Sequence, residues 1–397
     1  MTHRLKLFYL YRFLGESFFF VPALWPFLES RGLAPAEILL LNSFFCVVVV
    51  VFEVPTGALA DRIGRRPAMM LGSLAMAVAC LTYYVSSSFA AFAAAEALLA
   101  LGLTLMSGAD SAYLYDGLAD DDRASEYARR EGTASGFKHA GYAIACAAGG
   151  LLARIDLALP YLVTAATCAA AFVAACFLRE PSHVRRARGG PRVRAAVSLV
   201  VRSDRLRYLI AYSALVFCLV RVGLYLYQPA LRQAGYDVAS VGLILGGLHM
   251  LAAWTSHRSG GVRATVGEHA LMTILPLILA AGYLVLSQAA AWWCVTVLVL
   301  QAAANGVYSP LVKDLMQREI PDSRVRATVL SVESMARRVA FGLFTPLVAA
   351  AFGAGGLPGA LLASGAAGLA GTILLIGLRR REPREVARAE VAIEPPS

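Results

Sequence analysis

Apolar segments of about 20 residues recur along the whole chain and are separated by short breaks that carry charge, proline or glycine. A helix needs about 20 apolar residues to cross the hydrocarbon core of a bilayer. Hydrophobic residues make up 58% of the 397 residues and charged residues only 16%, whereas soluble domains contain about 25% charged residues. The sequence therefore predicts an all-α membrane protein.

The breaks between apolar segments predict twelve transmembrane helices. They lie near 5–28, 36–56, 68–87, 89–115, 132–153, 159–179, 206–230, 239–257, 267–287, 291–312, 329–350 and 358–378. Most of the 36 Lys and Arg residues fall on the termini, on one set of alternating loops or at adjacent helix ends. Because positively charged loops stay cytoplasmic, we expect both termini to be cytoplasmic in the inner (plasma) membrane of a bacterial cell.

A basic connector interrupts the apolar pattern once, near the middle of the chain. We expect a six-helix bundle over 1–180, a cytoplasmic connector over 181–205, a second six-helix bundle over 206–380 and a disordered tail over 381–397. Residues 28–39 align with 231–242, and residues 121–138 align with 321–338. This weak internal repeat predicts two pseudo-symmetric halves, which is a common layout of secondary transporters.

The loop between the second and third predicted helices combines glycines with unusual charge. Its sequence GALADRIGRR contains six residues of interest: Gly57, Asp61, Arg62, Gly64, Arg65 and Arg66. Glycine permits a tight reversal, and the arginines can pair with carboxylates or lipid phosphates. A simpler interpretation is that the arginines only fix the topology of the chain.

This loop resembles the Gly-x-x-x-Asp-Arg-x-Gly-Arg-Arg signature of the major facilitator superfamily at all six fixed positions. The chain also resembles that family in its helix number, central loop and repeat. The resemblance implies a cytoplasmic gate in which Asp61 caps the start of helix eleven near Thr328–Glu333. Arg62 or Arg65 would reach a carboxylate of helix four, Asp110 or Asp116. The related second-half segment, residues 257–267, keeps glycine and arginine but contains no aspartate.

Two further motifs of the family are degenerate in this chain. Thr104 stands where the arginine of helix four is expected, and Ala145 and Cys146 replace the Gly-Pro pair of the helix-five antiporter signature. We interpret Gly141, Ala145 and Gly149 as a small-residue stripe for helix packing.

Polar residues repeat at helical spacing in the segments that the resemblance places around a central cavity, namely helices one, four, seven and ten. The substrate-cavity candidates are Arg12, Phe19, Phe20, Glu96, Arg221, Tyr225, Gln228, Gln301, Asn305 and Tyr308. Spacing of i, i+4, i+7 puts three polar groups on one helical face. The alternative is that these groups form internal salt bridges or hydrogen bonds between helices.

Glu16 and Asp110 are the candidates for proton coupling. In the repeat register Glu16 and Arg221 lie at nearly equal depth, so we expect them to pair or to share a ligand. We expect Lys138 and Arg338 to pair structurally, for example with Glu131 or Glu333.

These patterns predict a secondary transporter that exports a small amphipathic organic compound in exchange for protons by alternating access. An importer or facilitator of a small organic solute, which could be anionic, would use the same fold. No catalytic cluster, metal-ligand spacing or Walker motif occurs, so an enzyme is a distant alternative, and we expect neither cofactor nor metal. The expected partners are substrate, protons and lipids, without nucleic acid, and the expected state is a monomer.

Overall fold

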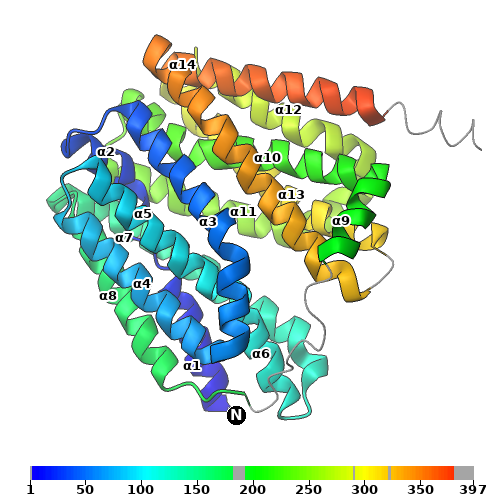
Figure 1. The fold of residues 1–397 in the computed structure, drawn as a ribbon. Helices are drawn as coiled ribbons and strands as arrows, with labels where there is room; N and C mark the ends of the chain where they lie inside the picture. The colour runs from blue at the N-terminus through cyan, green and yellow to red at the C-terminus, as the bar shows by residue number, and fades with distance from the viewer. Residues whose placement is uncertain (1, 182–192, 289–290, 321–322, 380–397) are drawn as a thin grey trace, which may run out of the picture.

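The computed structural model describes residues 2–181, 193–288, 291–320 and 323–379, and every regular element within them is a helix (Figure 1). The elements are α1 (Thr2–Gly15), η1 (Val21–Ala23), α2 (Leu24–Ser30), α3 (Pro35–Ile63), α4 (Arg65–Val85), α5 (Phe89–Met106), α6 (Ala109–Ala119), η2 (Ala124–Glu126), α7 (Tyr127–Ile155), α8 (Leu159–Cys176), α9 (Val193–Arg202), α10 (Asp204–Gln233), α11 (Val238–Val266), α12 (Glu268–Leu286), α13 (Ala291–Glu319) and α14 (Ser323–Arg379). The predicted all-α membrane protein is confirmed.

Nine helices in the described part of the chain are long and apolar enough to cross a membrane. The predicted span 5–28 is divided between α1 and α2, each of which is too short to cross a membrane alone. The predicted span 132–153 falls on α7, whose charged residues lower its hydropathy. The predicted spans 329–350 and 358–378 both lie in α14, where Gly355 and Gly356 depart from helical geometry. The number twelve therefore remains a prediction.

Helices from the two predicted halves meet along two long contacts. Figure 1 shows α1 to α8 at the lower left and α10 to α14 at the upper right, and across this division α7 packs on α11 and α3 packs on α14. Helix α9 lies within the predicted connector and packs against α14 and α10. The predicted tail, 381–397, lies outside the described residues, and the domain boundaries remain predictions.

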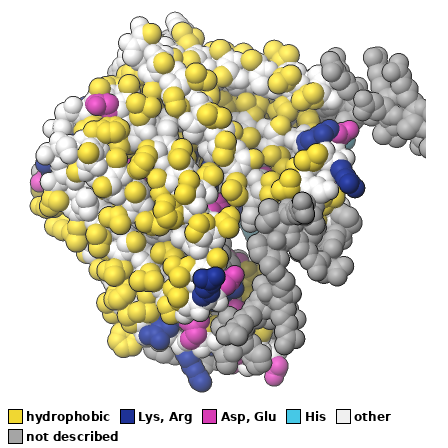
Figure 2. Space-filling view, in the orientation of Figure 1, with side chains coloured by type: hydrophobic (Ala, Val, Ile, Leu, Met, Phe, Trp, Pro, Cys, Tyr) yellow, Lys and Arg dark blue, Asp and Glu magenta, His cyan; other side chains and the backbone are white. Residues whose placement is uncertain are grey.

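Hydrophobic side chains dominate the outer surface of the helices. Figure 2 shows them over most of the face formed by α3, α4, α5 and α14, while Lys and Arg gather toward the lower and right-hand ends. Large side chains such as Val51 (58% exposed) and Leu343 (71% exposed) point outward. An apolar surface of this extent fits lipid and not water.

We call the end that carries residues 61–66 the motif face, and the opposite end, with Glu29 and Arg232, the far face.

Glycines of α7 allow unusually close helix packing. A Cβ atom on Gly149 would lie 1.9 Å from the carbonyl oxygen of Phe19, and one on Gly141 would lie 2.4 Å from that of Phe13. On the other side of α7, a Cβ atom on Gly150 would lie 2.7 Å from the carbonyl oxygen of Val238 in α11. The interpretation of Gly141, Ala145 and Gly149 as a packing stripe is confirmed at both glycines.

Gly150→Ala should push α7 away from α11, because the added methyl group meets backbone and not a flexible side chain. We expect the folded state to lose about 1–3 kcal/mol, as overpacked sites do, measured as a lower unfolding temperature in detergent. Gly136→Ala on the same helix is the matched control, since no atom lies within 4 Å of its Cβ position. Equal stability of the two variants would contradict the close α7–α11 contact.

Candidate functional site

The motif loop is fixed to the end of the sixth predicted helix by a carboxylate. Gly64 adopts a positive φ of 104° between α3 and α4. The Glu180 carboxylate accepts the backbone N–H groups of Arg65 at 2.7 Å and Arg66 at 2.8 Å, which are the first residues of α4. The Arg66 guanidinium donates to the last carbonyl oxygens of α8. A negative charge at a helix N-terminus is favourable, so Glu180 caps α4.

Asp61 and Arg65 form an ion pair within the motif loop, with Nη1 of Arg65 2.6 Å from Oδ1 of Asp61. Nε of Arg65 also lies 3.9 Å from the Asp116 carboxylate in α6, as expected for a helix-four acid. The expected cap of α14 is not formed: among the described residues, no hydrogen bond joins Asp61 to Thr328–Glu333. Arg62 is exposed, and the Cβ position of Gly57 has no neighbour within 4 Å.

The second half contains a charge-reversed counterpart of this loop. Glu268 follows Gly267 (φ 84°) as Arg65 follows Gly64, and Glu268 pairs with Arg263. Arg263 also pairs with Asp314 of α13, and Arg318 lies 3.2 Å from Glu268 and 3.1 Å from Asp314. The acid that sequence comparison found missing is therefore present on the other side of the glycine.

Five charged side chains lie where α1, α6 and α7 meet. Arg12 is buried and pairs with Asp110, and its Nη2 lies 3.7 Å from Glu131. Lys138 pairs with Glu16 at 2.9 Å. We call these five residues, with two cations and three carboxylates, the α1–α7 charge cluster.

The pairing within this cluster differs from the sequence-based expectation. Glu16 pairs with Lys138 and not with Arg221, and Lys138 in turn does not pair with Glu131. Arg338 lies 3.8 Å from Glu53 of α3, so it bridges the two halves. The alignment of the two repeats predicts the depth of these groups along their helices. It does not predict their ion-pair partners, because these depend on the direction in which each side chain points around its helix.

Glu126, in the turn between α6 and α7, differs from the acids of the charge cluster because three arginines surround it. Its pKa is lowered to about 2 by the hydrogen bond from Arg123, with further bonds from Arg129 and Arg130. It therefore stays ionised throughout the physiological pH range and is not a proton carrier.

A cavity of about 400 Å³ lies between α10, α11, α13 and α14, and Tyr142 of α7 closes one side. Four predicted cavity residues line it: Arg221, Gln301, Asn305 and Tyr308. The lining residues that sequence reasoning missed include Tyr142, Tyr227, His249 and Arg337. Arg337 stands next to Arg338 in the sequence, so the tandem arginines were the available signal.

Two predicted cavity residues of α10 join the halves near the far face. The Tyr225 hydroxyl donates to Oδ1 of Asn42 at 2.5 Å. Gln228 accepts the backbone N–H of Trp25 at 3.1 Å and donates to the carbonyl of Val21 at 2.9 Å. Ion pairs Glu29–Arg232 (2.5 Å) and Arg154–Asp237 (3.5 Å) add to this junction. The halves are thus joined at the far face.

The remaining cavity candidates pack inside the first half. Phe20 stacks on Tyr161, with ring centroids 5.1 Å apart, and the backbone N–H of Phe19 donates to Thr164 at 3.0 Å. Glu96 is buried and accepts the Tyr83 hydroxyl at 2.6 Å. Together with Arg12, these side chains lie outside the 400 Å³ cavity.

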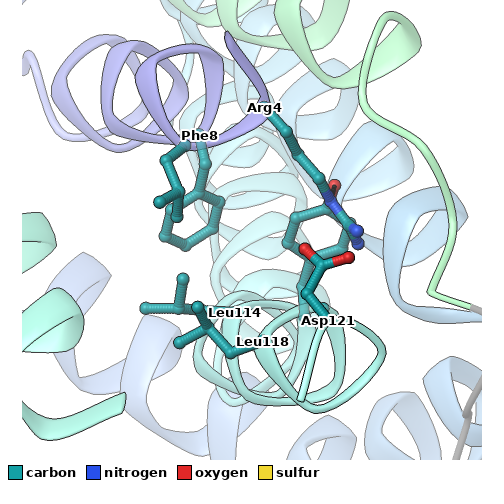
Figure 3. A pocket seen from close by; sticks show the side chains of 8 residues that line it. Arg4, Phe8, Leu114, Leu118 and Asp121 are labelled. Carbon is teal, nitrogen blue, oxygen red and sulfur yellow. Dashed lines mark hydrogen bonds between the residues drawn. The ribbon is translucent and has the colours of Figure 1, made fainter. Parts of the chain in front are cut away.

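A second hollow, at the motif-face end of α1 and α6, is too small for an organic substrate. Figure 3 shows Arg4 and Asp121 on one side of it and Phe8, Leu114 and Leu118 on the other. Its volume of about 10 Å³ is close to the minimum for one water molecule.

The family model described as the Major Facilitator Superfamily matches residues 7–341. A tetracycline resistance protein, class G, from Vibrio anguillarum is 28% identical over 346 residues, 82% of this chain and 85% of that protein. A class C tetracycline resistance protein from Escherichia coli is 27% identical over 294 residues, 71% of this chain and 70% of that protein.

Solved transporters share the fold at low sequence identity. The nucleoside transporter NupG superposes with a TM-score of 0.79 and 11% identity, covering 94% of this chain and 98% of that one. A D-xylose–proton symporter superposes with a TM-score of 0.73 and 12% identity, covering 94% and 95%.

Glu180→Ala should destabilise the first half by about 0.5–2 kcal/mol, the usual cost of losing a helix cap, because two N–H groups of α4 lose their acceptor. Glu180→Gln keeps one acceptor oxygen and should fall between wild type and Glu180→Ala. Unfolding temperatures of the three proteins in detergent provide the measurement. A Glu180→Ala protein as stable as wild type would show that the cap contributes nothing.

Proposed function

Because this chain belongs to the Major Facilitator Superfamily, we propose that it exports a small amphipathic organic compound in exchange for protons. Its family and its solved structural neighbours make it a multi-pass membrane transporter and not an enzyme. Proton coupling, export and the kind of substrate are the parts that we propose.

The charge cluster of α1, α6 and α7 carries the proposal of proton coupling. Its three carboxylates exceed its two cations by one, so a single bound proton makes the cluster neutral. An uncompensated charge at membrane depth is costly. Asp110 and Glu131 share Arg12, and Glu16 has Lys138, so the proton has a defined set of acceptors. His139, next to Lys138, is exposed.

The position of the cluster connects protonation to the arrangement of the halves. It joins α1 and α6 to α7, and α7 is the helix that packs most closely against α11 of the other half. Neutralising one carboxylate weakens its electrostatic attraction to Arg12 or Lys138. This change alters the relative free energy of the inward-open and outward-open arrangements of the two halves. The two halves then rock about the cavity in alternating access.

We infer that the motif face is cytoplasmic, with both termini on that side of a bacterial inner membrane. The support is the basic character of this face, which includes Arg62, Arg65, Arg66 and the α9 region, because positive loops stay cytoplasmic. Anionic lipids are the expected neighbours of these side chains, and the transporter is proposed to act as a monomer.

Export is supported by the two curated relatives, whose names describe tetracycline resistance. The cavity volume also fits an organic compound of drug size. Uptake of a small organic solute is the second candidate, because solved structural neighbours include a nucleoside transporter and a sugar symporter. The direction of substrate movement under an imposed pH gradient separates export from uptake.

Proteoliposomes with an imposed pH gradient test the proposal, with tetracycline as the first compound. Wild type should move the compound against the direction of proton flow. Asp110→Asn and Glu16→Gln each remove one carboxylate from the cluster, and at least one of them should abolish gradient-driven transport, while downhill exchange of the compound continues.

Asp121→Asn, in the exposed turn after α6 and outside the cluster, is the matched control and should transport as wild type does. Full gradient-driven transport in both Asp110→Asn and Glu16→Gln would rule out the proposed coupling site. Transport that ignores the gradient in wild type would rule out proton coupling altogether.

A further inference from the structure

We propose that the transported compound is an organic anion and that Arg221 binds its negative charge. This inference rests on the proposed function only in taking the 400 Å³ cavity as the substrate site. It adds the chemical class of the substrate and the residue that selects it.

The cavity has a positive lining. Arg221 of α10 and Arg337 of α14 both contribute to its wall, and no carboxylate is among the lining residues that the structure describes. Arg337 has a partner, since its Nε lies 2.8 Å from Glu333 one helical turn earlier. Ser213 donates to Glu333 and is hydrogen-bonded to Tyr308, which also lines the cavity. The charge of Arg337 is therefore largely balanced.

Arg221 has no such partner. Across the described ranges, no carboxylate lies within 4 Å of its guanidinium group, which faces the Phe45 ring at 5.9 Å. Its hydrogen-bond partner is the neutral Tyr225 hydroxyl. The buried acid Glu96 acts on Arg221 only from a distance and accepts the Tyr83 hydroxyl. An unpaired cation within a membrane-spanning helix is costly, and an anionic ligand in the adjoining cavity would supply the missing charge.

The other residues that line the cavity indicate the chemical character of the uncharged part of this ligand. Apolar side chains cover most of the cavity wall, and the Tyr142 and His249 rings lie 4.1 Å apart where α7 meets α11. Oε1 of Gln301 is buried without a hydrogen-bond partner in the described structure, while its Nε2 donates to Leu279. These groups fit an aromatic anion that also carries an O–H or N–H donor.

Three probes that share one ring system separate charge from shape. Pyrene-1-butyrate, pyrene-1-butanol and pyrene-1-butylamine carry charges of about −1, 0 and +1 near neutral pH. Equilibrium dialysis of purified protein against empty micelles of the same detergent corrects for partition into detergent. We expect the butyrate to bind tightest to wild type.

Arg221→Gln removes the charge without breaking an ion pair, and the buried acid Glu96 keeps its hydrogen bond from Tyr83, so this variant should fold. It should weaken binding of the butyrate by about 10- to 100-fold, the range for a hydrogen bond to a charged group, and leave binding of the alcohol nearly unchanged. Arg221→Lys should keep the preference for the anion. Arg207→Gln, near the exposed start of the same helix, is the matched control and should bind all three probes as wild type does.

Tighter or equal binding of the alcohol or the amine, or no binding of the butyrate, would overturn the assignment of an anion. So would an Arg221→Gln protein that keeps the wild-type preference. Binding is measured here without a gradient or a membrane. The anion assignment can therefore fail while gradient-driven export stands, and export can fail while the anion assignment stands.

Discussion

An ionised side chain at the centre of a bilayer costs about 2.5–3.5 kcal/mol even on the most lenient experimental scale. The packing of α1, α6 and α7 offsets this cost by pairing side chains of opposite charge. Arg12, Asp110, Glu131, Glu16 and Lys138 lie together, and Arg12 and Asp110 are largely buried. The break at Gly108, where φ is 81°, starts α6 just before Asp110 and places this acid in the first turn. Charge pairing thus helps to hold α1, α6 and α7 together, and we propose that the one carboxylate in excess makes the cluster responsive to a proton.

Close contact of the helices depends on small residues as much as on charge. Gly149 and Gly150 of α7 face different neighbours, Gly149 toward Phe19 of the first half and Gly150 toward α11 of the second. Because these two positions have no side chain, α7 can contribute to the charge cluster and still pack directly against the other half. This combination makes α7 the structural link between the proposed proton site and the cavity.

The sequence alone was sufficient for the fold class and for four of the cavity residues, because both follow from helical periodicity. Arg221, Gln301, Asn305 and Tyr308 line the cavity as expected. Tyr225 and Gln228 share a helical face with Arg221 but contact Asn42, Trp25 and Val21, since spacing cannot say which neighbour covers each part of that face. Glu180 and Glu268 were missed because each acts from outside the motif that it completes.

Distances between the halves test most directly whether this transporter alternates between two arrangements under the control of protons. Spin labels on the far face, at Ala34 and Gln233, and on the motif face, at Asp121 and Ala264, can be placed on a background without native cysteines. Pulsed electron–electron double resonance measures each distance at low and at high pH. Between the two pH values, the far-face distance should lengthen as the motif-face distance shortens. Distances that stay fixed at every pH, or that change on one face only, would contradict proton-controlled rocking of two halves.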